Sequence, residues 1–200
     1  MTGGTGPVLG GDGVARCPWG AGDDVNRAYH DTEWGMPILG EAAYLERLTL
    51  EAFQSGLSWR TILEKRENFR DAFAGFDADT VAAYDDVDRA RLMADAGIVR
   101  NRAKIDATIG NAAAFLATAA EFGAFDAYLD SVVPSPAARL PGTATVADVP
   151  ATTPVSDALS ADLRRRGFRF VGSTIVYAFM QSVGLVDDHL PGCFRYGVTR

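Results

Sequence analysis

Residues 91–105 read RLMADAGIVRNRAKI, and this stretch decides the fold. Apolar residues at helical spacing lead up to Gly97, and a second helical pattern begins just past the turn, at Arg102. The pattern predicts two helices joined by a tight turn. Because the first backbone N–H groups of the second helix point outward, they can hold a phosphate without a large positive charge. A glycine turn between helices is common in proteins of every function, so by itself this pattern favours a purely structural turn.

Helical spacing of apolar residues continues along most of the chain, and long alternating strands are missing. In residues 41–55 the apolar stripe contains Tyr44, Leu48 and Ala52, and Gly56 supplies the C-terminal stop. Further helices are expected at residues 58–69, 78–84, 88–96, 102–118, 125–133, 156–166 and 173–183. The sequence therefore predicts the all-α fold class.

The same patterns predict how the chain is divided. Residues 1–15 are Gly-rich and are expected to form a flexible tail. They lack the cationic start and apolar core of a secretory signal, so a signal peptide is not expected there. Residues 134–150 are rich in Pro, Thr and Gly and are expected to form a loop. We expect a single helical domain over residues 16–200, with the hairpin around residues 91–109.

The composition is acidic, with 200 residues, a net charge of −7 and a pI near 4.8. Phosphate binding is driven largely by Lys and Arg, so this balance favours an enzyme that acts on a small molecule. Basic residues nevertheless gather at Arg100, Arg102 and Lys104, and again in residues 164–169. Clusters of this kind are more often solvated faces than binding faces, and both classes of protein stay open.

The location of the protein is also indicated by composition. No stretch approaches the roughly 20 consecutive apolar residues that span a bilayer. The chain has only two cysteines, fewer than small secreted domains use. We therefore expect a cytoplasmic protein.

The chain contains two cysteines and two histidines in total, which are Cys17, His30, His189 and Cys193. Two thiolates and two imidazoles complete a tetrahedral shell for Zn²⁺, and a shell filled by protein leaves no position for water. A zinc ion there would be structural and would join the two ends of the chain. By spacing alone, two buried free thiols with two ordinary histidines are as well supported, and a Cys17–Cys193 disulfide is a lesser alternative.

One carboxylate lies at an unexpected position in the helical pattern. At about 100° per residue, Glu51 falls within the apolar stripe of residues 41–55. A carboxylate facing a core is costly unless it is paired or functional. Trp59 follows shortly, and Tyr29 immediately precedes His30. An acid, an indole and a phenol suit a flat, electron-poor heterocycle, although the periodicity alone favours a half-exposed Glu and two core aromatics.

Taken together, these residues resemble the DNA-3-methyladenine glycosylase I family. The resemblance runs in order from residue 16 to residue 195 and combines specific short motifs. The matching runs are RCPW at 16–19, AYHD at 28–31, EWG at 33–35, LE at 50–51, GLSW at 56–59, KRENF at 65–69, DAGI at 95–98, SDALS at 156–160, RGF at 166–168, FVG at 170–172 and DH at 188–189, followed by Cys193.

The resemblance implies a helix-hairpin-helix glycosylase fold and a single structural zinc. It implies the ligand set Cys17, His30, His189 and Cys193. It also implies a base pocket in which Glu51 and Tyr29 are catalytic and recognise the adenine edge, while Trp59 stacks on the ring. The hairpin residues expected to contact DNA are Gly97, Val99, Arg100 and Arg102.

Two positions depart from the family pattern. Asn26 stands where an aromatic residue that helps line the pocket is expected, and Asp130 stands where a tryptophan is expected. The first departure affects stacking on one side of the base, and the second affects one wall of the site.

The function implied by the resemblance is base-excision repair. The protein is expected to flip a damaged nucleotide out of double-stranded DNA and hydrolyse the N-glycosidic bond of 3-methyladenine, which leaves as the free base. A monofunctional monomer is expected, without a lysine Schiff base and without a cofactor beyond zinc. Two rival classes stay open, namely a glycosylase with another base preference and a zinc-stabilised helical module that binds DNA or protein without chemistry.

Overall fold

The computed structural model describes residues 6–134 and 138–198. The predicted tail therefore lies outside the described residues at 1–5, and so does the predicted loop at 135–137. Over the described residues, every helix is too short or too polar to cross a lipid bilayer.

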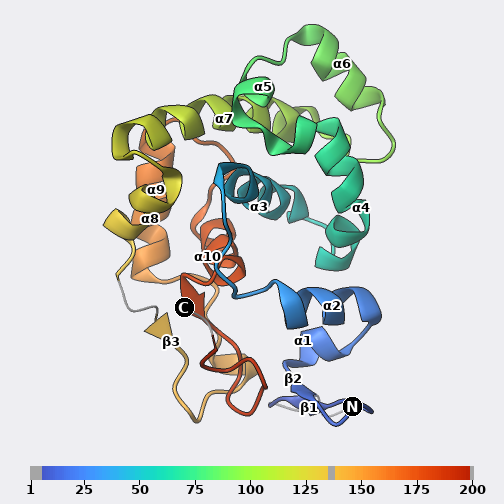
Figure 1. Ribbon diagram of the computed structural model, residues 1–200, viewed down its shortest axis with the longest axis vertical. Helices are drawn as coiled ribbons and strands as arrows, with labels where there is room; N and C mark the ends of the chain where they lie inside the picture. Colours follow the sequence, from blue (N-terminus) through green and yellow to red (C-terminus); the bar gives the residue numbers. More distant parts are fainter. Residues whose placement is uncertain (1–5, 135–137, 199–200) are drawn as a thin grey trace.

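The described chain is mostly helical (Figure 1). The helices are α1 (Pro18–Ala21), α2 (Asp24–Thr32), α3 (Glu41–Gln54), α4 (Trp59–Ala72), α5 (Ala78–Ala82), α6 (Asp86–Ala94), α7 (Arg102–Phe122), α8 (Phe125–Val132), α9 (Pro154–Arg165) and α10 (Ser173–Ser182), with short 3-10 helices η1 (Ala74–Phe76) and η2 (Val146–Asp148). The strands are β1 (Val8–Leu9), β2 (Ala15–Arg16), β3 (Ala138–Arg139) and β4 (Val186–Asp187). β1 pairs antiparallel with β2, and β3 pairs parallel with β4.

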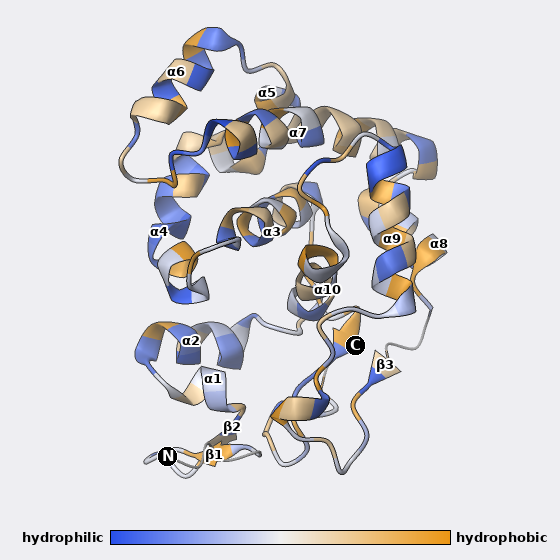
Figure 2. Ribbon diagram, turned by 180° about the vertical axis from the view of Figure 1, so that it is seen from behind, coloured by the Kyte–Doolittle hydropathy of each residue, from blue (hydrophilic) through white to orange (hydrophobic). Residues whose placement is uncertain are grey.

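The core is built around α3 and α10, which pack against each other in the middle of the molecule (Figure 1). Leu45, Leu48 and Phe53 of α3 are almost completely buried, and so are Val176 and Phe179 of α10. These side chains belong to one continuous apolar cluster that also includes residues of α4, α7, α8 and α9. Hydrophilic residues lie on the outward faces, as on α6 at the edge of the molecule (Figure 2).

The helices predicted from residues 41 onward are confirmed, with ends that differ by a few residues. Local capping determines some of these ends. Ser58 caps α4 by accepting a hydrogen bond from Thr61 N at 3.1 Å. Thr153 caps α9 and Pro154 begins it, so this helix starts two residues before the predicted Ser156.

The N-terminal region differs from the sequence expectation. Helical periodicity did not predict α1 and α2, which lie within residues 18–32. Asp23 caps α2 by accepting hydrogen bonds from Val25 N and Asn26 N, a signal that is visible in the sequence. Residues 8–9, expected in the flexible tail, pair with residues 15–16. The loop at residues 134–150 likewise contains a short strand and a 3-10 helix.

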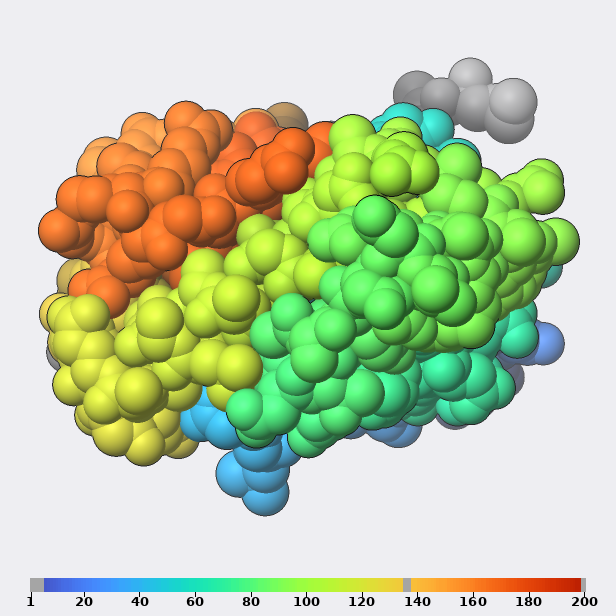
Figure 3. Space-filling model, turned by 90° about the horizontal axis from the view of Figure 1, so that it is seen from above, coloured from blue at the N-terminus to red at the C-terminus, as the bar shows by residue number. Residues whose placement is uncertain are grey.

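The predicted hairpin is present as α6, a turn and α7. Close packing favours Gly97 there, because a Cβ would lie 2.9 Å from Asp95 Oδ1 and 3.0 Å from Asn68 Cγ on α4, and these side chains would have to shift. The turn is held by Lys65, whose Nζ donates to the backbone O of Ala96 and of Gly97 at 3.1 and 3.0 Å. Seen from above, α7 lies between the α5–α6 segment and the residues that follow α9 (Figure 3).

Candidate active site and metal centre

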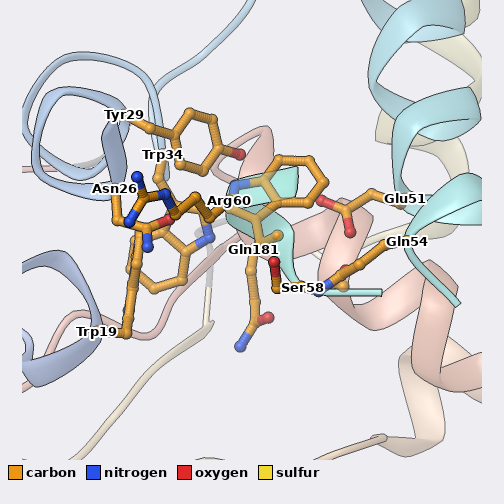
Figure 4. A pocket seen from close by; sticks show the side chains of 11 residues that line it. Trp19, Asn26, Tyr29, Trp34, Glu51, Gln54, Ser58, Arg60 and Gln181 are labelled. Carbon is orange, nitrogen blue, oxygen red and sulfur yellow. The ribbon is translucent and has the colours of Figure 1, made fainter. Parts of the chain in front are cut away.

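A cavity of about 370 Å³ opens between α1, α2, α3, α4 and α10 (Figure 4). Its size falls in the usual range for small-molecule sites. Its lining residues are Trp19, Asn26, Tyr29, Trp34, Glu51, Gln54, Ser58, Trp59, Arg60, Ala178 and Gln181. A second hollow shares Glu51, Gln54 and Ala178 with it and extends past Leu57 towards Thr174. The three pocket residues named from the sequence, Tyr29, Glu51 and Trp59, therefore meet at one cavity.

Glu51 is buried on α3, whereas the periodicity alone favoured a half-exposed side chain at the edge of the apolar stripe. Within the described part of the chain, no group is hydrogen-bonded to its carboxyl. Burial raises the pKa of Glu51 from 4.5 to about 8, against the opposing effect of the Arg47 charge one turn earlier. The sequence analysis treated Glu51 as a carboxylate. The raised pKa instead favours the neutral acid near pH 7.

Tyr29 enters the cavity from α2, with its hydroxyl directed towards the side of the cavity that holds Glu51 (Figure 4). Its phenol oxygen accepts a hydrogen bond from Arg47 Nη1 at 2.6 Å. Burial raises the pKa of the phenol well above its ordinary value, so Tyr29 stays protonated.

Trp59 is the first residue of α4, and its ring lies 5.3 Å from the Tyr29 ring at an angle of 53°. The two rings therefore form neighbouring walls of one aromatic corner. The indole nitrogen of Trp59 is buried without a hydrogen-bond partner among the described residues. An unsatisfied buried donor destabilises the fold by about 1–3 kcal/mol, so this N–H is available to an acceptor that enters the cavity.

The two departures from the family pattern have different outcomes. Asn26 lines the cavity and its Nδ2 donates to Asp23 Oδ2 at 2.8 Å, so this wall is polar. Asp130 is exposed on α8 and is not among the residues that line the cavity. The expected effect of Asp130 on a wall of the site is therefore absent.

Sequence analysis missed several lining residues. Trp19 and Trp34 were quoted only as parts of motifs, yet their rings lie 5.0 Å apart and form one wall of the cavity. Gln181 comes from α10, and its Nε2 donates to Asp188 Oδ2 at 2.7 Å. No helical periodicity marks these three residues, because they reach the cavity from separate elements.

The two cysteines and two histidines meet in one buried cluster. Their ligand atoms all lie within 4.8 Å of one another. Cys193 Sγ lies 3.5 Å from His30 Nε2 and 3.8 Å from His189 Nδ1, which is also 3.8 Å from Cys17 Sγ. Both cysteines are free, which excludes the Cys17–Cys193 disulfide. A cluster of this composition and spacing is able to hold a metal ion.

Further contacts orient these four side chains. His30 Nδ1 lies 2.8 Å from Asp31 Oδ1, and His189 Nε2 lies 3.3 Å from Trp34 O. Each imidazole therefore turns one nitrogen to the cluster and the other to an acceptor, the arrangement found around metal-bound histidines. The backbone N–H of Leu190 donates to Cys17 Sγ at 3.3 Å.

The turn of the hairpin packs against α4, where Lys65 Nζ and Asn68 Nδ2 donate to Gly97 O. Arg100 and Arg102 are exposed, whereas Gly97 and Val99 are partly buried. Lys104, counted with the basic cluster in the sequence, is instead buried against α3. Its Nζ donates to Phe53 O and Ser55 O at 3.0 and 3.1 Å, so it does not contribute to a basic surface.

The comparisons with known proteins agree with this arrangement. Residues 19–196 match the family model described as methyladenine glycosylase. The chain is 46% identical over 183 residues to DNA-3-methyladenine glycosylase 1 of Escherichia coli (strain K12), covering 92% of this chain and 97% of that protein.

Solved structures show the same fold. A crystal structure of 3-methyladenine DNA glycosylase I superimposes with a TM-score of 0.86 at 44% identity, over 90% of this chain and 99% of that one. The enzyme from Staphylococcus aureus, solved to describe its recognition of 3-methyladenine, gives a TM-score of 0.84 at 35% identity, over 90% and 95% of the two chains. The chain therefore belongs to the methyladenine glycosylase family.

Proposed function

We propose that this protein is a monofunctional DNA-3-methyladenine glycosylase, which hydrolyses the N-glycosidic bond of 3-methyladenine in alkylated DNA. One observation carries the proposal: Glu51, Tyr29 and Trp59 converge on a single cavity with aromatic walls. The family and its relatives, which are named for this activity, support the same conclusion.

The contacts of Lys104 support a common DNA-binding face for the hairpin and the cavity. Lys104 lies in the first turn of α7, and its Nζ bonds hold the end of α3 that leads into the Gly56–Ser58 loop. That loop lines the hollow that continues from the cavity. A nucleotide flipped from a duplex bound at Arg100 and Arg102 thus has a short path to Glu51.

Glu51, Tyr29 and Trp59 have separate roles in binding the base. The N3-methylated adenine nucleotide is cationic, and a cation beside Glu51 favours the ionised carboxylate. The Trp59 ring supplies a surface for stacking, and the walls formed by Tyr29, Trp19 and Trp34 exclude water. Glu51 and the Tyr29 hydroxyl form hydrogen bonds with polar atoms of the base edge.

Bond cleavage uses the charge already present on the substrate. The electron pair of the bond between the sugar C1′ and the base moves to the base, which leaves neutral. Water adds to C1′ and loses a proton, which completes hydrolysis. Among the described residues that line the two hollows, none is a lysine, which favours this course over a Schiff base. A pocket that binds the neutral product better than the cationic nucleotide lowers the barrier.

We infer that Cys17, His30, His189 and Cys193 hold one structural zinc ion. Ligand atoms at about 2.0–2.3 Å from zinc in tetrahedral directions are separated by about 3.3–3.8 Å. Three S–N pairs of the cluster lie at 3.5 to 3.8 Å and all four ligand atoms lie within 4.8 Å of one another, so a small contraction would complete the shell. When bound, the ion would cross-link the two ends of the chain and would take no part in the reaction of the substrate. We also propose that the protein acts on double-stranded DNA, that it is a monomer and that it is located in the cytoplasm.

Incubation of the protein with methylated duplex DNA tests the proposed function. Free 3-methyladenine should appear in the supernatant, and the DNA strand should stay intact until heated with alkali. A protein that binds this DNA but releases no base would instead be a non-catalytic DNA-binding module.

Asn26 favours a second candidate function, a DNA glycosylase with another base preference. Where an aromatic wall is expected, this residue places a polar amide, and the exposed Arg60 lines the same cavity. A panel of duplexes with other alkylated bases, tested against the protein and its Asn26→Tyr variant, separates a broadened preference from strict recognition of 3-methyladenine.

A further inference from the structure

A buried arginine stands behind the phenol of the pocket. Arg47 lies on α3 with only 6% of its surface exposed and is not among the residues that line the cavity. Its Nη1 donates to the Tyr29 hydroxyl at 2.6 Å, and its guanidinium carbon lies 5.0 Å from the centre of the Tyr29 ring. Its contact with the site therefore runs through Tyr29.

The Arg47 bond restricts the direction of the Tyr29 hydroxyl hydrogen. Conjugation keeps a phenolic O–H in the plane of its ring, which leaves two positions for the hydrogen. A guanidinium has no lone pair and can only donate, so it occupies the acceptor side of the oxygen. The hydrogen must then take the other position, and the Tyr29 oxygen faces the cavity that also holds Glu51 (Figure 4).

Glu33 forms ion pairs with both Arg47 and Arg66, and these pairs fix the position of the Arg47 guanidinium. Glu33 Oε2 lies 3.4 Å from Arg47 Nη2 and 2.6 Å from Arg66 Nη1. The carboxylate thus neutralises part of two cations, and the cluster of Arg47, Glu33 and Arg66 keeps one net positive charge. Arg47 also precedes Glu51 by one helical turn, so the same cation favours ionisation of that acid.

We propose that Arg47 is a positioning residue of the pocket, which makes Tyr29 a hydrogen-bond donor to an acceptor atom on the edge of the bound purine. The inference deepens the proposed function and rests on it. It adds a residue outside the cavity that sets the polarity of one recognition group. The pocket then binds a purine whose ring nitrogen accepts a hydrogen bond from the Tyr29 hydroxyl. It rejects a purine that directs an N–H donor at that hydroxyl.

A double-mutant cycle tests the inference. Single-turnover excision of 3-methyladenine is measured for the native protein, Arg47→Met, Tyr29→Phe and the double variant. Arg47→Met should lower the rate about 10- to 100-fold, the scale of a hydrogen bond to a charged group, with duplex affinity unchanged. In the Tyr29→Phe background the same change should lower the rate much less, because the hydroxyl is already gone and only the effect of the Arg47 charge on Glu51 is left.

A matched control is available on the same pair of helices. Arg70 of α4 joins Glu46 of α3 through Nη2 at 2.8 Å and has no contact with the cavity. Arg70→Met therefore removes an interhelical arginine pair and should leave the excision rate unchanged. Arg47→Lys keeps a cationic donor and should recover most of the rate. If Arg47→Met does not fold, Arg47→Gln, which removes the charge and can accept from the phenol as well as donate to it, completes the cycle with Tyr29→Phe.

The pH dependence of free 3-methyladenine binding is a further readout. The ionisable groups around Glu51 are Arg47 on its own helix, Tyr29 from α2 and Arg60 from α4. Loss of the Arg47 charge should move the pH midpoint that reports Glu51 upward, whereas a structural role would leave it in place. Equal rate losses from Arg47→Met in both backgrounds, or an unmoved midpoint, would overturn the inference. A native protein that releases no 3-methyladenine would reject the proposed function instead.

Discussion

His189 Nε2 lies 3.3 Å from the backbone O of Trp34, so the cluster of two cysteines and two histidines and the aromatic cavity share a contact. The His189 ring also meets the Trp34 ring edge-on at 4.5 Å. The cluster that joins the two ends of the chain therefore supports the aromatic wall of the pocket as well as the fold.

Loss of a metal ligand should weaken both stability and base binding. Cys193→Ser should lower the bound zinc from one ion per chain to near zero and depress the melting temperature, because metal binding energy contributes to folding. The affinity for free 3-methyladenine, followed by tryptophan fluorescence, should fall with it. Tyr196→Phe, which removes only the bond from Tyr196 Oη to Leu140 O in the same segment, is the control. A metal-free native protein of unchanged stability would contradict the assignment.

Glu51 should be required for excision and dispensable for duplex binding. Glu51→Ala should lower the rate of 3-methyladenine release by about one to two decades, the scale of a lost hydrogen bond to a charged partner. Duplex affinity should change little, because phosphate contacts supply most of it. Glu46→Gln changes a carboxylate on the same helix outside the cavity and should keep the native rate. Full excision by Glu51→Ala would make Glu51 a structural residue and leave catalysis to Tyr29 and Trp59.

The raised pKa of Glu51 should make the folded protein less stable at alkaline pH. Its value of about 8 in the folded protein lies above the ordinary 4.5, so the folded state binds more protons between these limits. The free energy of unfolding should therefore fall as the pH rises from about 4.5 to about 8, by at most about 1.4 kcal/mol per pH unit. Glu51→Gln should flatten this dependence and be more stable than the native protein at pH 9. Urea titrations across this range give the slopes, and parallel curves for both proteins would argue against a buried neutral acid.

The hairpin should contribute equally to the affinity for damaged and for undamaged duplex DNA. Gly97→Val would press a side chain against Asn68, and Arg102→Glu would reverse an exposed charge, so both should weaken duplex affinity on damaged and undamaged DNA alike. The salt dependence should be shallow, because few phosphates are contacted. Gly110→Ala, at an open position on the same α7, is the matched control for the glycine change. If both variants keep the native affinity for duplex DNA, the basic residues 164–169 become the candidate DNA-binding surface instead of the hairpin.

Sequence periodicity was sufficient for the elements that carry the fold. The stripe of residues 41–55 predicted α3 and placed Glu51 within its apolar face, and the Gly97 pattern predicted the hairpin. Both follow from spacing within one or two adjacent helices, which a 3.6-residue repeat records directly. The helices α1 and α2 were missed, because α1 is only four residues long and α2 carries only three apolar residues, Val25, Ala28 and Tyr29.

By itself, the sequence determined the helical class, the position of the acid and the identity of the four candidate metal ligands. Only the tertiary structure decided which residues surround that acid, that Lys104 is buried against α3, and that Arg47 stands behind Tyr29. Helical periodicity depends on neighbours a few positions away, so it can be read from the chain. The donor direction of a phenol and the pKa of a carboxyl depend on groups brought together from distant elements, and that arrangement exists only once the whole core has packed.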